Sequence, residues 1–464
     1  MDLRALSAVD LAAAIRDKKV TSVEATTEAL KRAHTVHAKT NAVISFEDEA
    51  ATAAAKVADA RLAIGQIAGR LHGVPLAHKD MFDRVGRIPS WGARIRQDKP
   101  CDSDATVIDR LQREGSHQIA ALHLTEFAFG PTGHNYVLGH AKNPWDLKHI
   151  TGGSSSGSAI AVATGVVPAA LGSDTAGSLR LPAAALGITS LKPTWSRVSR
   201  AGAMPLSPSL DCVGPIARDV RDLALLFRII AGHDVNDGTS SQRPVPAASA
   251  FEPGSITGMR IGVDEALLAQ ADSSVQTRMA TAMDVLVKAG AKKVAVKFPD
   301  WRMLDQLCQL LQLPEVASAH GAHLRKRGAD FGPQVRARIE FGHFVSGADH
   351  QTALRARGTM LKQTLADTYA NCDVTILPTF ADPLPTIDAL DITGGPTLQA
   401  AMGRVVLFCR PVNYLGLPAL TLPYAREGQL PNGFQLVGRP FAEADLIKLG
   451  LAYQQVVKPE LAPL

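Results

Sequence analysis

The sequence that decides the fold is a pair of small-residue segments, Gly152-Gly153-Ser154-Ser155-Ser156-Gly157-Ser158 and Gly172-Ser173-Asp174-Thr175-Ala176-Gly177-Ser178-Leu179-Arg180. From 150 to 195 the chain is packed with Gly, Ser, Thr and Ala, where a typical core uses Leu and Phe. A flexible linker shares this composition, but it would not be interleaved with apolar residues such as Ile160, Val166 and Leu171. Because glycine permits close backbone approach and serines supply hydroxyl groups, the region predicts a site built from main-chain amides.

The whole chain has the balance of an ordinary globular protein. Its 464 residues are 46% hydrophobic and 20% charged, which excludes disorder and fibrous repeats. The net charge is only +5. The basic residues between Arg325 and Arg357 are predicted to lie on solvated helix faces, so no nucleic-acid partner is expected.

Cysteine usage and hydropathy indicate the compartment. The five cysteines form no CxxC pair, which argues against a disulfide framework or a structural zinc site and favours a reducing, cytoplasmic compartment. The N-terminus shows no secretory signal. The longest weakly polar stretch, Ala159 to Gly172, is shorter than the roughly 20 residues that span a bilayer, so no membrane association is expected.

Helical and strand patterns alternate along the chain, which predicts a mixed α/β fold. Thr21-Ser22-Val23-Glu24 is a capping-box pattern that begins a helix. The short apolar run from Leu71 predicts a strand that delivers Lys79 into the interior. The other predicted helices are 50–61, 220–230 and 275–289, and the other predicted strands are 118–124 and 259–263.

Two common kinds of site do not fit the motifs. The glycine-rich loop at 152–158 has neither the GxxxxGK[ST] lysine nor a GxGxxG pattern, so no nucleotide or other cofactor is expected. His320 and His323 could share a helical face, but no further ligand pattern completes a metal site, and packed or surface histidines are predicted. No metal is expected.

Ser178 is the candidate nucleophile, because it ends a run of small residues whose N–H groups can converge as an oxyanion hole. The segment is not a GxSxG elbow, and no downstream Asp and His are evident as partners. A lysine can act as the base if burial keeps it neutral, and Lys79 is the candidate. A second serine, from the loop 152–158, could relay the proton.

The sequence resembles the amidase signature family over nearly its whole length. The resemblance implies a Ser-cisSer-Lys triad: Ser178 as nucleophile, Ser154 as the cis serine after a cis Gly153–Ser154 bond, and Lys79 as base. It also implies oxyanion donors at 175–178, namely Thr175, Ala176, Gly177 and Ser178, and supporting roles for Ser155, Asp174 and Arg180. The matching motifs are 73–80, 124–130, 142–146, 152–159, 172–182, 191–194, 206–211, 214–215, 413–418 and 433–438.

The same resemblance implies the architecture, a single α/β/α sandwich over 1–464 with helices on both faces of a mixed, twisted central sheet. Within it we distinguish an N-terminal helical segment at 1–70, a catalytic core at 71–220 and a variable substrate-pocket region at 300–403. Arg243 to Pro253 is then an internal connection. The sequence departs from the usual motif at His78, Ser156, Ala176 and Trp195-Ser196, and His78 could either lower the pKa of its neighbour Lys79 or merely pack.

The implied activity is hydrolysis of an amide C–N bond through an acyl-enzyme on Ser178. Small-molecule aryl or aliphatic amides, carbamates such as urethanes, and ureas all fit. One alternative is the amidase subunit of a glutamine-dependent tRNA amidotransferase, which needs partner chains. A second is a catalytically silent binding protein on the same fold. A homodimer is the default oligomer.

Overall fold

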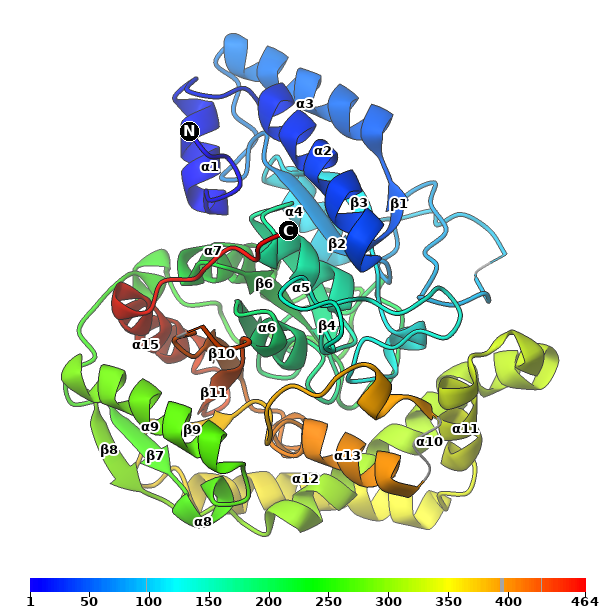
Figure 1. Ribbon diagram of the computed structural model, residues 1–464, viewed down its shortest axis with the longest axis vertical. Coiled ribbons are helices and arrows are strands. Elements are labelled where there is room, and N and C mark those ends of the chain that lie inside the picture. The colour runs from blue at the N-terminus through cyan, green and yellow to red at the C-terminus, as the bar shows by residue number, and fades with distance from the viewer. Residues whose placement is uncertain (97, 393–395, 427) are drawn as a thin grey trace.

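The computed structural model describes residues 1–96, 98–392, 396–426 and 428–464, and its strands form two sheets (Figure 1). The larger sheet has eight strands in the order β4-β6-β5-β10-β11-β9-β7-β8, and the smaller has three in the order β1-β3-β2. The larger sheet is mixed, because β7 pairs in parallel with β8 and β9 while the other pairs are antiparallel. The strands are β1 Val43–Phe46, β2 Pro75–Lys79, β3 His117–Leu122, β4 Ala169–Asp174, β5 Thr189–Lys192, β6 Cys212–Ala217, β7 Arg260–Val263, β8 Lys292–Ala295, β9 Val374–Pro378, β10 Ala419–Pro423 and β11 Gly433–Gly438.

Helices flank the larger sheet, which confirms the predicted α/β class and sandwich architecture (Figure 1). The first three helices lie together beside the small sheet, at the top of Figure 1. The helices are α1 Ala8–Arg16, α2 Ser22–Thr40, α3 Asp48–Ala63, α4 Thr106–Arg113, α5 Ser156–Ala163, α6 Arg180–Ala185, α7 Val220–Ile230, α8 Glu265–Leu268, α9 Ser273–Lys288, α10 Trp301–Arg327, α11 Pro333–Gly342, α12 Gly347–Asp367, α13 Pro396–Val406, α14 Arg410–Tyr414 and α15 Glu443–Val456.

Local sequence signals placed several elements correctly. The Thr21 hydroxyl accepts a hydrogen bond from the Glu24 N–H at 3.0 Å, and the Glu24 carboxylate accepts one from the Thr21 N–H at 2.8 Å, so the predicted capping box begins α2. Helix α7 has the predicted bounds, Val220–Ile230. The four-residue strand β1, Val43–Phe46, was not predicted, because its pairing with β3 is a contact between distant segments that the local sequence does not show.

The two sheets meet where β2 lies beside β4, and this junction holds the base and the nucleophile segment close together. The Leu171 N–H of β4 donates to the Nδ1 atom of His78 on β2 at 3.0 Å. The Lys79 ammonium or amine, at the end of β2, lies 2.8 Å from the Ser173 hydroxyl of β4. The structure therefore has two sheets where one central sheet was expected, and hydrogen bonds of the His78 and Lys79 side chains link them at β2 and β4.

The small residues after Ser154 let α5 pack inside the protein. Every residue of Ser156–Ala163 is buried. A Cβ atom at Gly157 would stand 2.4 Å from the carbonyl oxygen of Ala42 and 2.4 Å from the backbone nitrogen of His123, so only glycine fits there. The unusual composition of the segment thus follows from the close approach of backbone on all sides.

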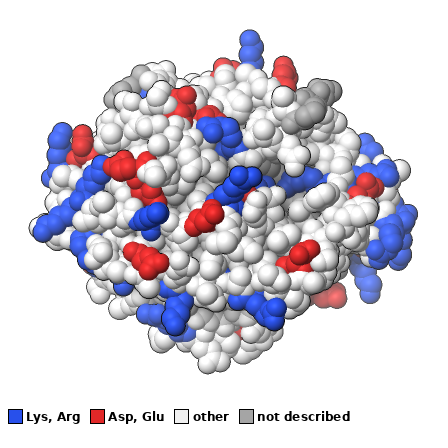
Figure 2. Space-filling model, turned by 90° about the horizontal axis from the view of Figure 1, so that it is seen from below, with Lys and Arg blue, Asp and Glu red and all other residues white. Residues whose placement is uncertain are grey.

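Surface charge and helix hydropathy do not mark a site on the molecule. Basic and acidic side chains are interspersed on the face shown in Figure 2. Within the described ranges, no helix is both long enough and apolar enough to cross a bilayer. The divisions 1–70, 71–220 and 300–403 stay predictions. Residue 97 of the second and residues 393–395 of the third lie outside the described residues.

Candidate active site

Lys79 is brought together with Ser154, as predicted. Its Nζ atom lies 2.8 Å from the Ser154 Oγ atom and 2.8 Å from the Ser173 Oγ atom. The side chains of Lys79 and Ser154 are both buried. Ser173 was missed by the sequence analysis, although it stands inside the nucleophile segment, because only the position of β4 beside β2 reveals that it faces the lysine.

Burial lowers the pKa of Lys79 from 10.5 to about 7. The carboxylates of Asp211 and Asp174 act in the opposite direction, but they do not offset the loss of solvation. Near neutral pH a substantial fraction of the side chain is therefore the free amine. A neutral lysine amine can accept a proton, which is the property that a general base requires.

The nucleophile candidate, Ser178, lies at a narrow cavity. It is 8% exposed, whereas Ser154 has no exposed surface, and it lines a space of about 20 Å³. The Gly153–Ser154 peptide bond is cis. The Ser178 hydroxyl forms no hydrogen bond with any described residue, so its link to Ser154 stays a prediction, and such contacts often tighten only when substrate is bound.

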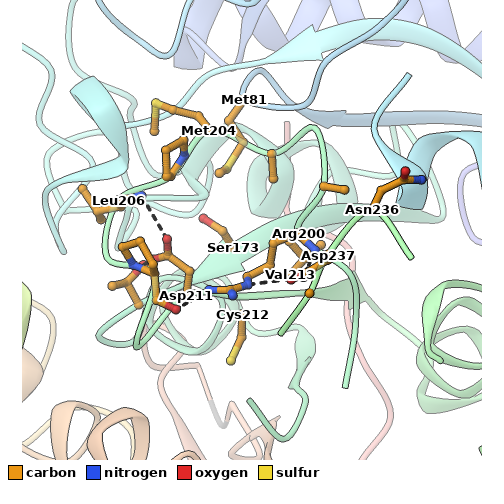
Figure 3. A pocket seen from close by; sticks show the side chains of 16 residues that line it. Met81, Ser173, Arg200, Met204, Leu206, Asp211, Cys212, Val213, Asn236 and Asp237 are labelled. Carbon is orange, nitrogen blue, oxygen red and sulfur yellow. Dashed lines mark hydrogen bonds and ion pairs between the residues drawn. The ribbon is translucent and has the colours of Figure 1, made fainter. Parts of the chain in front are cut away.

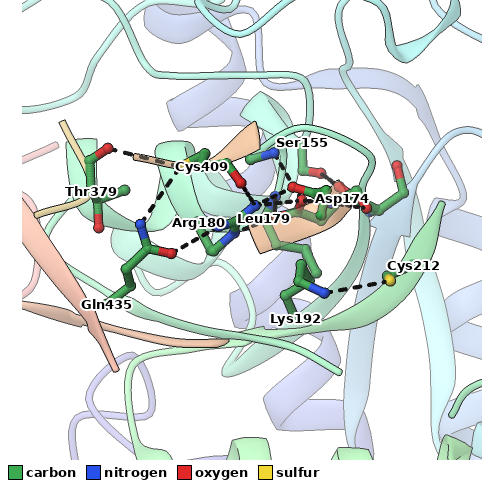
Figure 4. A network of polar contacts seen from close by, with 12 residues as sticks. Ser155, Asp174, Leu179, Arg180, Lys192, Cys212, Thr379, Cys409 and Gln435 are labelled. Carbon is green, nitrogen blue, oxygen red and sulfur yellow. Dashed lines mark hydrogen bonds and ion pairs between the residues drawn. The ribbon is translucent and has the colours of Figure 1, made fainter. Parts of the chain in front are cut away.

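Asp174 and Arg180 hold the loop that carries Ser178 (Figure 4). The Asp174 carboxylate accepts hydrogen bonds from the Gly177 N–H at 2.8 Å and the Leu179 N–H at 3.2 Å, and it pairs with Arg180 at 3.0 Å. Both charged side chains are fully buried. Burial alone would raise the pKa of Asp174, but the Arg180 guanidinium outweighs it and holds that pKa well below its usual range.

The same arginine ties the loop to the C-terminal part of the chain. Its guanidinium donates to the Gln435 side-chain oxygen at 2.8 Å and to the Cys409 carbonyl at 3.1 Å (Figure 4). Asn413 donates to the Asp174 carboxylate at 2.8 Å. These contacts give Asp174 and Arg180 a structural explanation, while their predicted supporting role in activity stays a prediction.

The backbone amides of the loop differ in their availability. The Gly177 N–H is engaged by Asp174. No hydrogen bond joins the N–H groups of Thr175, Ala176 or Ser178 to a residue in the described part of the chain. Of the four expected oxyanion donors, three therefore have an N–H group without a protein partner among the described residues, and all three of these residues line the cavity at Ser178. The Ser155 hydroxyl, expected to support the site, bonds the Ser173 carbonyl at 3.3 Å.

His78 is a packing residue with a neutral ring. Burial lowers its pKa to about 3, and its Nδ1 atom accepts the Leu171 N–H at 3.0 Å, which leaves the ring proton on Nε2. It therefore places no positive charge beside Lys79 at neutral pH. Of the two roles considered for His78, the structure supports packing.

A larger cavity of about 260 Å³ adjoins the site (Figure 3). Ser173 and Asp211 line it, and Thr175 lines both this cavity and the one at Ser178. Asp211 accepts the Thr175 hydroxyl at 2.5 Å and the Leu206 N–H at 2.9 Å. Burial raises the pKa of Asp211 to about 6. Asp211 lies within the matching motif 206–211, but no signal in the sequence marked it as a neighbour of the base.

His320 and His323 lie near each other, with ring centroids 6.4 Å apart. His320 is buried, bonds the Pro205 carbonyl oxygen at 3.1 Å and packs against Phe127. Among the described residues, no group of three or more His, Cys, Asp or Glu side chains is placed to hold a metal ion.

Comparison with known proteins assigns the family. The sequence model of the family named Amidase matches residues 24–447. The chain belongs to the amidase family. A relative from Chloroflexus aggregans, named as a subunit of glutamyl-tRNA(Gln) amidotransferase, is 37% identical over 473 residues, and the match covers 96% of each chain. A protein of the same name from Coxiella burnetii is 35% identical over 463 residues, with 95% of each chain covered.

Solved structures support the same assignment for this amidase-family chain. A protein described in connection with a vestigial complex and the origins of an s-triazine catabolic enzyme superposes with a TM-score of 0.90 at 30% identity, covering 98% of this chain and 100% of that one. A glutamyl-tRNA(Gln) amidotransferase subunit from Thermotoga maritima superposes with a TM-score of 0.79 at 29% identity, covering 99% of each. The protein is thus an amidase-signature enzyme that acts on amide C–N bonds, by hydrolysis or as part of an amidotransferase.

Proposed function

We propose that this chain cleaves an amide C–N bond through an acyl-enzyme on Ser178. The observation that carries the proposal is the buried Lys79 amine within 2.8 Å of the Ser154 hydroxyl. Neutral Lys79 accepts the proton of Ser154, Ser154 accepts that of Ser178, and the Ser178 oxygen attacks the carbonyl carbon. The negative charge on the carbonyl oxygen is stabilised by the amides of Thr175, Ala176 and Ser178.

Collapse of this intermediate breaks the C–N bond, and the proton held by the relay passes to the leaving nitrogen. Water then enters, loses a proton along the same path and attacks the acyl carbon. The Ser178 oxygen leaves with that proton, and the carboxylic acid is released. Carbamates and ureas would follow the same steps through a carbamoyl-enzyme, and they stay predicted substrates.

The test is replacement of Ser178 by alanine. We expect S178A to lose amide hydrolysis while its thermal unfolding is unchanged, and to lose covalent labelling by a sulfonyl fluoride, mapped by mass spectrometry. Ser158→Ala is the matched control, since Ser158 lies in the other serine-rich segment and donates to the Leu171 carbonyl at 3.0 Å. Undiminished turnover in S178A would contradict the proposed nucleophile.

The relatives favour a second candidate over a stand-alone hydrolase. Proteins named as subunits of glutamyl-tRNA(Gln) amidotransferase are 35% and 37% identical to this chain over nearly their whole length. In that role the same site would release ammonia from glutamine in a complex with partner proteins that act on tRNA. Affinity purification of the tagged chain from its native cells tests this: stable partner chains, with glutaminase activity only in their presence, support it.

A further inference from the structure

Lys79 has two hydroxyl neighbours, and the proposed mechanism uses only one of them. Lys79 is 1% exposed, and its Nζ atom lies 2.8 Å from the Oγ atoms of both Ser154 and Ser173. The proton relay to the nucleophile runs through Ser154, whereas Ser173 has no part in it. Because a hydroxyl group can accept one hydrogen bond while it donates another, Ser173 can pass on a proton in the same way as Ser154.

The two hydroxyl groups lead to different cavities. Ser154 belongs to the relay toward Ser178, whose cavity of about 20 Å³ we call the nucleophile cavity. Ser173 lines the cavity of about 260 Å³, which we call the Asp211 cavity (Figure 3). Exposed residues such as Asn236 also line this larger space, so it reaches the surface, and it has room for several water molecules. Ser173 therefore joins the buried base to a cavity that is open to solvent.

The charges around the two cavities differ in sign. Arg338 and Arg410 line the nucleophile cavity, and no acidic side chain of the described residues lines it. In the Asp211 cavity, Arg200 is paired with Asp237 at 3.6 Å, whereas the Asp211 carboxylate accepts hydrogen bonds but forms no ion pair with a described residue. An excess proton is therefore repelled from the nucleophile cavity and attracted into the Asp211 cavity.

Hydrolysis itself leaves one proton on the base. The carboxylic acid formed from the acyl-enzyme has a pKa of about 4, whereas the pKa of Lys79 is about 7. The acid therefore gives up its proton, which passes through the hydroxyl groups of Ser178 and Ser154 to the Lys79 amine. The acid O–H bond breaks, an N–H bond forms, and a carboxylate and an ammonium group remain. Because the leaving amine departs uncharged, Lys79 must lose this proton before it can act as a base again.

We propose that Ser173 returns this proton to solvent by way of water in the Asp211 cavity. The inference rests on the proposed acyl-enzyme mechanism and adds a second route to its proton relay. An N–H bond of Lys79 breaks as the Ser173 oxygen gains that proton, and the hydroxyl proton of Ser173 passes to a water molecule. The Asp211 carboxylate attracts the hydronium ion that forms, and bulk solvent takes up the proton. The Lys79 amine is restored, and Ser173 is unchanged.

Steady-state kinetics of Ser173→Ala test this route, because a slow proton loss after product release lowers kcat but not kcat/KM. The substrates are glutamine and para-nitroacetanilide, whose amine product is coloured. The enzyme is the tagged chain with any partner chains that copurify from its native cells. We expect S173A to lower kcat and KM together by about tenfold or more and to leave kcat/KM within about twofold. An unchanged kcat, or equal falls in kcat and kcat/KM, would overturn the proposal, since the latter shows only that Ser173 holds Lys79 in place.

Two further variants and a small base separate the relay from misfolding. Ser173→Thr keeps the hydroxyl group and should retain kcat within about threefold. Ser190→Ala is the matched control and should change neither constant, because it removes a buried hydroxyl on β5 that has no partner among the described residues. Imidazole should raise kcat of S173A, where it takes over the proton, but not kcat of the wild type; no gain in S173A contradicts the relay. Normal kinetics in S173A with inactivity of S178A overturn the relay alone, whereas a wild type that turns over neither substrate overturns the proposed function as well.

Discussion

The ionisation of Lys79 should set the pH dependence of turnover. Burial lowers its pKa from 10.5 to about 7, which corresponds to about 5 kcal/mol of lost stabilisation of the charged form. At pH 7 roughly half of the side chains are then neutral, compared with about one in three thousand for a solvated lysine. We expect kcat/KM for an amide to rise with pH, with a slope of one on a logarithmic plot, and to level off above a midpoint near 7.

A second group could produce a similar profile, so the assay needs a variant. Asp211 also ionises in this range, with a pKa raised by burial to about 6, and its carboxylate raises the pKa of Lys79. In Asp211→Asn the midpoint of the pH profile should move to lower pH, because the negative charge beside Lys79 is gone. The acidic limb of the profile, which is the fall of kcat/KM at low pH, should persist. Loss of the limb in this variant, or activity in the wild type that is flat down to pH 5, would refute the assignment of the limb to Lys79.

The remaining predictions concern stability. Replacing Asp174 by Asn leaves Arg180 buried without a counter-charge, so the free energy of unfolding, measured by urea titration, should fall by about 3–5 kcal/mol. The control is Asp373→Asn, which removes a half-exposed ion pair and should change the free energy of unfolding by less than about 1 kcal/mol. Equal losses in the two variants would contradict the argument. Replacing His78 by Leu leaves the buried Leu171 N–H without its acceptor and should cost about 1–3 kcal/mol of stability. Because His78 is neutral, the midpoint of the pH profile should not move, and a shift would show that it carries charge.

Local patterns predicted the elements better than their assembly. The capping box at Thr21 and the helix Val220–Ile230 are fixed by residues close in sequence, and the structure confirms both. Strand β1 has only four residues and depends on its pairing with β3. The division into two sheets likewise depends on contacts between distant segments, which no local signal reports.

For the candidate site too, residues in the local motifs could be predicted, but the contacts between distant segments could not. Ser178 and Lys79 were candidates from the residues around them, whereas the resemblance to the family singled out Ser154 among the serines of the loop 152–158. Ser173 stands in the predicted nucleophile segment, but its contact with the lysine follows from the strand order. Arg338 lies far from Ser178 along the chain, and only the fold brings both to one cavity.

The contacts of Arg180 join segments of the chain that are synthesised at different times. Arg180 donates hydrogen bonds to Cys409, Asn413 and Gln435, which lie 229, 233 and 255 residues further along the chain. During translation the segment that bears Ser178 leaves the ribosome long before the residues that hold its arginine. A chain that stops before Cys409 lacks all three of these hydrogen-bond acceptors for Arg180. The anchoring of the Ser178 loop through Arg180 therefore depends on residues that are made much later in translation than the loop itself.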